Sequence, residues 1–139
     1  MNKDVAYTDG EIDLIAGETG GRKGIYYYKI QKSGSSEVYG HCYLLADNEK
    51  PCHMGNGGFY IAEQYRGREY AVKACRLLLQ AAVQIGMKAV FFAVNKDNIA
   101  SRRVCEKLGC CCLGTIGPEE HAENYSESAL ERDLYQFIL

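Results

Sequence analysis

The sequence predicts a single α/β domain built around a mixed β-sheet. The chain has 139 residues, the usual size of one domain, and we expect that domain to span residues 1–139. Its first half has the short aromatic-rich segments of strands, and a period of three to four residues follows in the middle. Because strand-like and helical segments then alternate toward the C-terminus, we expect an α/β fold.

The first half predicts strands joined by turns. Residues 11–16 form a short apolar stretch that ends at the turn-prone segment 17–23. Segments 25–32 and 38–46 are rich in aromatic and β-branched residues, and the turn residues 33–36 separate them, which predicts a hairpin. A polar loop at 47–57 contains Pro51 and leads to a further strand at 58–62.

The period changes at Glu69, where a helix is predicted to run to Ile85. Its apolar stripe is formed by Ala71, Cys75, Leu78, Ala82 and Ile85, and its polar side by Lys73, Arg76, Gln80 and Gln84. Gly86 supplies a C-terminal stop. Residues 89–94 are apolar throughout and predict a strand covered on both faces, parallel to 58–62 in a βαβ unit.

A second helix is predicted to begin after Asn98, whose side chain can accept the first free N–H groups. Ala100, Val104 and Leu108 form its apolar stripe, and Gly109 is its stop. Residues 110–116 and 133–139 are predicted as closing strands, with an acidic loop from Pro118 to Glu131 between them.

Composition excludes several classes of function. The 16 Lys and Arg residues against 18 Asp and Glu give a net charge of -2, and no basic stripe or basic amphipathic segment predicts binding to nucleic acid or a membrane. Residues 1–10 are polar and lack the apolar core of a signal peptide, so we expect a cytoplasmic protein.

The seven cysteines predict reduced thiols that serve as small packing residues, because their number is odd and no C-x-x-C pair occurs. They are Cys42, Cys52, Cys75, Cys105, Cys110, Cys111 and Cys112. A metal site from His41, Cys42, Cys52 and His53 is the alternative, but that spacing matches no zinc pattern. We therefore predict no metal.

The segment from Tyr60 to Ala71 carries the chemistry. A strand runs into a short loop that opens a long helix, and the first turn of a helix offers unpaired N–H groups and partial positive charge to phosphates. Gly67 allows the backbone to approach an anion, and Arg66 and Arg68 add positive charge. The residues alone leave a solvated turn as an equal alternative. Neither G-x-G-x-x-G nor a Gly-Lys-Ser/Thr motif is present.

Two motifs resemble those of a known family. Gln64-Tyr65-Arg66-Gly67-Arg68-Glu69 resembles the pyrophosphate loop of the GCN5-related N-acetyltransferases (GNAT family), [Q/R]-x-x-G-x-[G/A]. The segment from Asn98 to Gly109 resembles the family's second signature, N-x-A-S-x-x-x-x-E-K-L-G. Residues 25–139 follow the family's order of elements. Because Cys105 replaces a frequent tyrosine, the chain looks closest to the ribosomal-protein-type, RimJ/RimL-like branch.

The resemblance implies a GNAT-like fold and acetyl-CoA as co-substrate, without a metal. It implies transfer of the acetyl group to a primary amine, either of a small molecule or of a protein N-terminus. By the same resemblance, the strand edge, the loop N–H groups and the start of the second helix would bind acetyl-CoA. The residues at these places are Tyr60, Ile61, Ala62, Arg66, Gly67, Arg68, Glu69, Tyr70, Ala71, Asn95, Asn98 and Ser101.

The family usually works by direct attack of the amine on the thioester. Backbone N–H groups near Ile61 and Ala62 would polarise the carbonyl. Glu63 is the first candidate for the base that takes the amine proton. Ser101 would lie near the sulfur, and Cys105 stands where other members have a tyrosine that protonates the thiolate. Weaker candidates for the base are Glu120, His121 and Tyr135.

Two departures from the family pattern affect these expectations. Glu69 replaces Gly or Ala, and its carboxylate, expected in the first helical turn, would repel the pyrophosphate. The segment from Gly17 to Gly24 is too short for the two helices that usually shape the acceptor site, so we expect that site to be open or completed by a second subunit in a homodimer. A catalytically weak acyl-CoA-binding regulatory module is therefore an alternative, and a general anion-binding domain is another.

Overall fold

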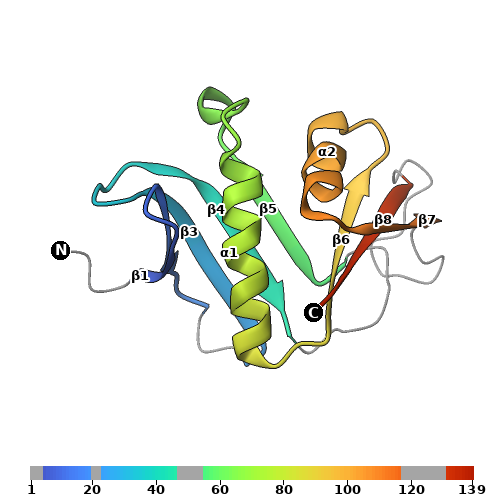
Figure 1. Cartoon of the computed structure of the whole chain (residues 1–139), viewed down its shortest axis with the longest axis horizontal. Coiled ribbons are helices and arrows are strands. Elements are labelled where there is room, and N and C mark those ends of the chain that lie inside the picture. The colour runs from blue at the N-terminus through green and yellow to red at the C-terminus, as the bar shows by residue number, and fades with distance from the viewer. Residues whose placement is uncertain (1–4, 20–22, 47–54, 117–130) are drawn as a thin grey trace.

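The computed structural model describes residues 5–19, 23–46, 55–116 and 131–139. In this part of the chain, eight strands form one sheet in the order β1-β2-β3-β4-β5-β6-β8-β7, and every neighbouring pair is antiparallel except β5 and β6. Two α-helices lie in front of the sheet in Figure 1 and contact each other, so they cover the same face. The predicted α/β class, mixed sheet and parallel βαβ unit are confirmed.

The bounds of the strands follow the predicted segments closely. They are β1 Val5–Thr8, β2 Ile12–Ala16, β3 Ile25–Lys32, β4 Val38–Leu45, β5 Gly57–Ile61, β6 Ala89–Asn95, β7 Cys111–Ile116 and β8 Arg132–Ile138. The hairpin of β3 and β4 is confirmed by their antiparallel register, in which Tyr28 faces Cys42. Most of the polar loop and of the acidic loop, including Pro51, Pro118, Glu120 and His121, lies outside the described residues.

The sequence did not predict β1 or the short 3-10 helix η1 at Glu63–Tyr65. β1 lies in a polar segment but pairs with β2, and the half-buried Tyr7 packs against the core. β2 then pairs directly with β3 from Ile12 to Ala16, so β1, β2 and β3 follow one another in the sheet. Among the described residues, no α-helix precedes α1.

α1 spans Tyr70–Ile85 and packs its apolar face on the sheet. Cys75, Leu78 and Ala82 are fully buried in the core, whereas Arg76 and Gln80 are exposed, as the periodicity predicted. Gly86 ends the helix in the left-handed region at φ 96°.

α2 spans Ile99–Leu108 and contacts α1 and β6. The Asn98 side chain accepts a hydrogen bond from the Ser101 N–H at 3.1 Å, and Gly109 ends the helix at φ 85°. Both predicted caps are therefore present. The Asn98 N–H donates to the carbonyl of Asn95, the last residue of β6, at 2.9 Å, so Asn98 links the end of β6 to Ser101.

β5 and β6 separate soon after they meet. Gly57, at the start of β5, pairs with Phe92 of β6, and Figure 1 shows the two strands diverging beyond that point. A Cβ on Gly57 would lie 2.6 Å from Val90 Cγ1, so glycine is what allows the strands to approach there. The separation leaves backbone groups of β5 without a neighbouring strand, next to the first turns of α1 and α2.

Candidate functional site

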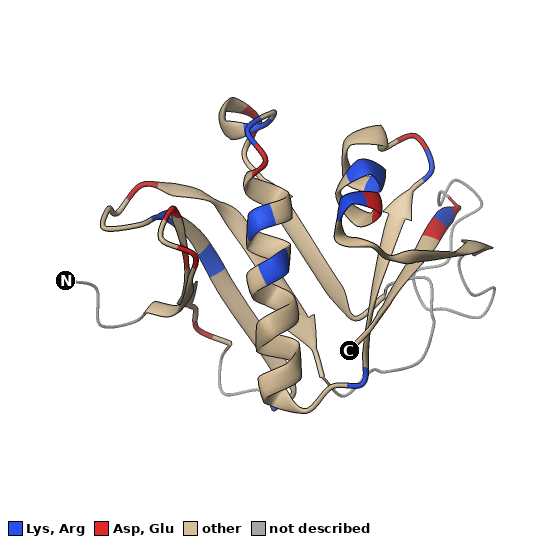
Figure 2. Ribbon diagram, in the orientation of Figure 1, with Lys and Arg blue, Asp and Glu red and all other residues tan. Residues whose placement is uncertain are grey.

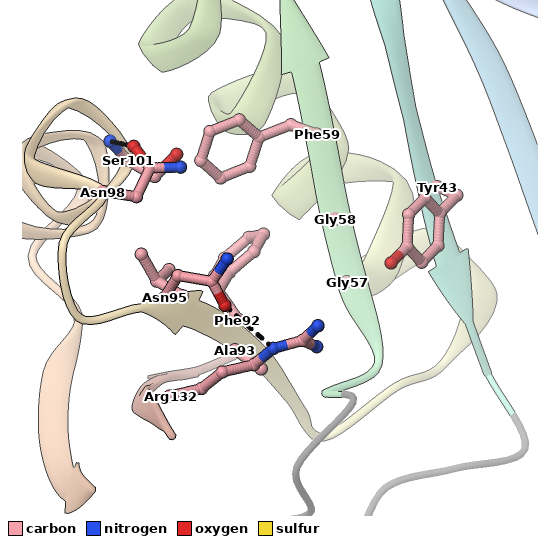
Figure 3. A pocket seen from close by; sticks show the side chains of 11 residues that line it. Tyr43, Gly57, Gly58, Phe59, Phe92, Ala93, Asn95, Asn98, Ser101 and Arg132 are labelled. Atoms are coloured by element: carbon pink, nitrogen blue, oxygen red, sulfur yellow. Dashed lines mark hydrogen bonds between the residues drawn. The ribbon is translucent and has the colours of Figure 1, made fainter. Parts of the chain in front are cut away.

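Two adjoining cavities lie where β5 and β6 separate. The helix cavity, of about 420 Å³, lies between the N-terminal end of α1 and α2. The gap cavity, of about 210 Å³, lies between β5 and β6 (Figure 3). Phe59, Asn98 and Ser101 line both, so a molecule in one would meet a molecule in the other at these three residues.

The loop before α1 has the backbone of an anion site. Gly67 has φ 82°, and no atom lies within 4 Å of a Cβ built there, so the loop leaves open space beside its backbone. The first N–H that bonds within α1 is that of Lys73, which donates to the Glu69 carbonyl at 3.1 Å. The preceding N–H groups of α1 begin at Tyr70, and no side chain caps them. A phosphate in the helix cavity would find these donors and the positive end of the helix.

Glu69 is not in the first helical turn, contrary to the prediction. It is the N-cap residue and has a left-handed backbone, with φ 68° and ψ 10°, the one positive φ at a non-glycine position among the described residues. This conformation is one that glycine adopts without strain and that a residue with a side chain seldom adopts. The Glu69 carboxylate makes no capping hydrogen bond to the helix N–H groups and forms an ion pair with Lys107 of α2.

Basic side chains gather on both sides of the helix cavity. Arg66, Arg103 and Lys107 line it, and Figure 2 shows basic positions on α2 and on the loop that precedes α1. The hydrogen bond with Lys107 holds the pKa of the Glu69 carboxyl below its ordinary value, so Glu69 is ionised at neutral pH. Its negative charge opposes the three basic charges at the place where phosphates would bind.

Only alternate residues of β5 direct their backbone N–H and C=O groups toward the side from which β6 has separated. Ala62 N–H donates to Tyr39 O and Leu45 N–H donates to Asn56 O, so residues 58, 60 and 62 direct their N–H and C=O groups to β4. Phe59 and Ile61 consequently direct theirs away from β4, toward the separated β6. Of the predicted backbone edge, Ile61 directs its N–H and C=O groups away from β4 and lines the helix cavity, whereas Tyr60 and Ala62 direct theirs to β4. Phe59 was missed.

Arg66 is held beside this edge. Its Nε donates to Ile61 O at 2.8 Å, and its guanidinium lies 5.4 Å from the centre of the Tyr60 ring. The Tyr60 ring in turn stacks on His41 with centres 5.3 Å apart. Arg66 is therefore anchored to the end of β5, and its Nε is already engaged there.

The gap cavity is lined by side chains from four strands. Tyr43 of β4 lies over Gly58, since a Cβ on Gly58 would come within 2.3 Å of the Tyr43 ring. Arg132 Nε of β8 donates to Asn95 Oδ1 of β6 at 3.1 Å, and Figure 3 shows the guanidinium directed across the gap toward Gly57. Asn95 lines this cavity and not the helix cavity.

Several predicted residues lie away from both cavities. Glu63 and Arg68 are exposed and line neither cavity. Cys105 is fully buried, and its hydrogen bond with Cys110 together with burial raises the pKa of its thiol. Tyr135 is buried, and its hydroxyl accepts a bond from Arg102 Nε at 3.4 Å. Of the two residues predicted near the sulfur, Ser101 lines both cavities and Cys105 lines neither.

Several residues that line the cavities were missed by the sequence reasoning. They include Tyr43, Phe59, Arg103, Lys107 and Arg132. Arg103 and Lys107 are four residues apart, a spacing that places two side chains on the same side of a helix, so periodicity could have indicated them as a pair. Tyr43 and Arg132 come from strands distant in sequence, and no local pattern indicates them.

Neither metal binding nor a membrane span is indicated in the described part of the chain. It contains no group of three or more His, Cys, Asp and Glu residues that could hold a metal ion. Its helices are too short or too polar to cross a membrane.

Comparison with known proteins agrees with the fold. The profile of the acetyltransferase (GNAT) domain family matches residues 3–111. The chain therefore belongs to the GNAT family. No curated protein sequence matches it.

Solved structures with the same fold include members of the predicted branch. One is the acetyltransferase of Salmonella typhimurium that modifies the N-terminal serine of ribosomal protein L7/L12, with 18% identity, a TM-score of 0.65, and coverage of 85% of this chain and 66% of that one. Another is the ribosomal-protein-S5-alanine acetyltransferase of Vibrio fischeri, with 17% identity, a TM-score of 0.65, and coverage of 83% and 62%. The resemblance to the RimJ/RimL-like branch is thus confirmed at the level of the fold.

A third structure was solved with ligands. It is the microcin C7 self-immunity acetyltransferase MccE in complex with acetyl-CoA and AMP, with 14% identity and a TM-score of 0.63. The match covers 84% of this chain and 62% of that one, so the chain spans less than two thirds of that protein's length.

Proposed function

We propose that the chain binds acetyl-CoA in the helix cavity and transfers the acetyl group to a primary amine that enters through the gap cavity. The observation that carries this proposal is the meeting of the two cavities at Phe59, Asn98 and Ser101. A thioester at the end of a chain lying in the helix cavity would reach this junction. An amine in the gap cavity would then face its carbonyl carbon.

The residues present fit a pyrophosphate and a pantetheine arm. The loop at Gly67 and the N–H groups from Tyr70 onward would bind the pyrophosphate, with Arg103 and Lys107 supplying positive charge. The outward backbone groups of Phe59 and Ile61 would pair with the amides of the pantetheine arm, as a neighbouring strand would. Because Arg66 occupies Ile61 O, we expect the Ile61 N–H and the Phe59 groups to provide this pairing.

The reaction we propose is direct displacement. The amine nitrogen forms a bond to the thioester carbonyl carbon, the C–S bond breaks, and the departing thiolate takes a proton. The Ile61 N–H would stabilise negative charge on the carbonyl oxygen. The Ser101 hydroxyl would donate a hydrogen bond to the departing sulfur. Glu63 follows β5 by two residues and, being exposed, would accept the amine proton through water.

Amine-dependent formation of coenzyme A tests this function. Wild-type protein should release free coenzyme A from acetyl-CoA only when a suitable amine is present, and the acetylated amine should appear in equal amount by mass spectrometry. Glu63→Gln should lower kcat mainly at low pH, where the remaining water route is slowest. Coenzyme A release that does not depend on an amine would contradict direct transfer.

A second function has one observation in its favour. The Glu69 carboxylate lies in the helix cavity and is paired with Lys107, which would weaken binding of a polyanion. An acyl-CoA-binding regulatory module tolerates weak binding and needs no acceptor. Saturable binding of acetyl-CoA without acetylation of any small amine or peptide N-terminus would favour this second function.

A further inference from the structure

The C-terminal end of α2 brings two cysteines together. The Gly109 N–H donates to the Glu106 carbonyl, and the Cys110 N–H donates to the Cys105 carbonyl, each at 3.0 Å. These two bonds and the left-handed backbone of Gly109 form a Schellman motif, in which the side chains of the two outer residues commonly pack against each other. Here both outer residues are cysteines, and their thiols share a hydrogen bond.

The rest of the fold holds this contact in place. Cys105 is fully buried in the core, and Cys110 is partly buried against the same core. Cys110 directly precedes β7, whose first residue, Cys111, pairs with Gln136 of β8. The two thiols are therefore held together between a helix end and a strand, and a bond between them would close a short loop whose backbone is already ordered.

The two thiols differ in reactivity. The hydrogen bond from Cys105 lowers the pKa of the Cys110 thiol, although the partial burial of Cys110 opposes this effect. The same hydrogen bond, together with burial, raises the pKa of the Cys105 thiol. The thiolate is the nucleophile in disulfide exchange, and Cys110 is the more exposed of the two residues. A reagent in solution would therefore react first with Cys110.

We propose that Cys105 and Cys110 are a redox modification site, at which a small disulfide such as oxidised glutathione produces a reversible disulfide bond. The Cys110 sulfur attacks one sulfur of the reagent, the S–S bond of the reagent breaks, and one half leaves as a thiol. The Cys105 sulfur then attacks the Cys110 sulfur and displaces the second half as a thiol. Two protein thiols are oxidised to one disulfide, one small disulfide is reduced to two thiols, and the protein's two thiol protons pass to the departing sulfurs. Without such a reagent both cysteines stay reduced.

This site is separate from the proposed acetyl transfer. Neither Cys105 nor Cys110 lines the helix cavity or the gap cavity. The inference therefore goes beyond the proposed function, and its test detects the disulfide directly and needs no measurement of acetylation.

Trypsin separates the two cysteines, because it cleaves after Lys107. Cys105 then lies in the peptide 104–107, and Cys110 lies in the peptide 108–132. A disulfide between the two cysteines holds these peptides together, and a reducing dithiol separates them again.

The test uses the full chain with Cys111→Ser and Cys112→Ser, so that Cys110 is the one cysteine of the second peptide. Both replaced side chains are exposed, so we expect the fold to be kept. The folded protein, freed of reductant, is incubated with oxidised glutathione, its remaining thiols are alkylated, and the peptides are analysed by mass spectrometry. The linked peptides should be the main form of Cys105 and Cys110. Cys110 found free, or carrying glutathione without a link to Cys105, would overturn the proposal.

Two further variants in the same background identify the partner of Cys110. Cys75 of α1 is the alternative partner, because it is buried in the same core and acts electrostatically on both thiols. Cys75→Ala should keep the yield of linked peptides within about twofold, whereas Cys105→Ala should leave Cys110 as a mixed disulfide with glutathione. Each removes one fully buried sulfur, so the two are matched controls, and circular dichroism checks that both are folded. A link between Cys110 and Cys75 in place of Cys105 would overturn the proposal, and the parent protein alone reveals such a link if a variant does not fold.

A redox titration separates proximity in the fold from proximity in the sequence. The glutathione concentrations at which half of the protein carries the bond give the effective concentration of one thiol toward the other. We expect this effective concentration to be at least about tenfold higher in the folded protein than in the same protein in denaturant. Equal values would mean that the Schellman motif does not bring the two sulfurs together, and would overturn the proposal.

Discussion

Replacement of Glu69 is the perturbation whose effects the structure defines best. Glu69 combines a left-handed backbone with a carboxylate that pairs with Lys107 in the helix cavity. Glu69→Gly removes both features, whereas Glu69→Gln removes the charge and keeps the backbone strain. Comparison of the two variants therefore separates electrostatics from backbone conformation.

The expected change in affinity is small because both partners are half exposed. The side chains of Lys107 and Glu69 retain 51% and 53% of their accessible surface, so their interaction is screened by water. Releasing Lys107 and removing the negative charge should tighten acetyl-CoA binding about two- to fivefold at low salt in both variants. The gain should nearly vanish at about 1 M salt, where the screening length falls to roughly 3 Å.

The expected change in stability differs between the two variants. Glycine adopts a φ of 68° without strain, which offsets the lost ion pair and the greater freedom of the unfolded chain. Glu69→Gly should therefore unfold at the wild-type temperature or up to about 4 °C higher, whereas Glu69→Gln should not gain.

Calorimetric titration with acetyl-CoA at two salt concentrations, together with thermal unfolding, measures both effects. Glu106→Gln, an exposed change on α2 outside the cavities, is the matched control and should alter neither. Unchanged or weaker binding by Glu69→Gln at low salt would refute the reasoning, since it would mean that Glu69 assists binding by holding Lys107.

Four further predictions follow from the same geometry. Gly67→Asp should weaken acetyl-CoA binding at least tenfold with little unfolding, which calorimetry and circular dichroism check, because the added carboxylate enters the anion site rather than the core. Ser101→Ala should lower kcat about tenfold or more and leave the acetyl-CoA dissociation constant within about twofold. Leu78→Ala should cost about 2–5 kcal/mol in the free energy of unfolding measured with denaturant, because Leu78 is fully buried. In native protein, Cys111 and Cys112 should react with a thiol reagent before Cys42, whose pKa burial raises to about 12, and all seven cysteines should react after unfolding without reductant.

Much of the fold could be predicted from sequence because its signals are local. The apolar stripe of α1 predicted that helix, and Gly86 and Gly109 predicted the C-terminal ends of α1 and α2. β1 was missed because its four residues are too few to give a clear periodic signal beside the polar residues that flank them, and it is held in the sheet by pairing with β2. The left-handed backbone at Glu69 could not be inferred either, since glutamate seldom adopts it and the surrounding loop imposes it.

Of the candidate site, only the part proposed to bind acetyl-CoA could be predicted from the sequence. The phosphate-binding loop and the start of α2 are continuous motifs, so the sequence indicated Gly67, Asn98 and Ser101. The gap cavity joins Tyr43 and Arg132 from strands far apart in the chain, and only the sheet order brings them together. Cys105 and Tyr135 are buried and therefore poor candidates for catalytic residues. No sequence pattern could indicate that burial. A cytoplasmic location and a homodimer stay predictions.

The central claim is that the helix cavity binds acetyl-CoA with its thioester at the junction of the two cavities. A crystal structure of the protein with acetyl-CoA tests it most directly. We predict the pyrophosphate within hydrogen-bonding distance of the N–H groups between Gly67 and Val72, the pantetheine arm beside Phe59 and Ile61, and the thioester next to Ser101. A cofactor bound elsewhere, or one whose thioester points away from the gap cavity, would contradict the account.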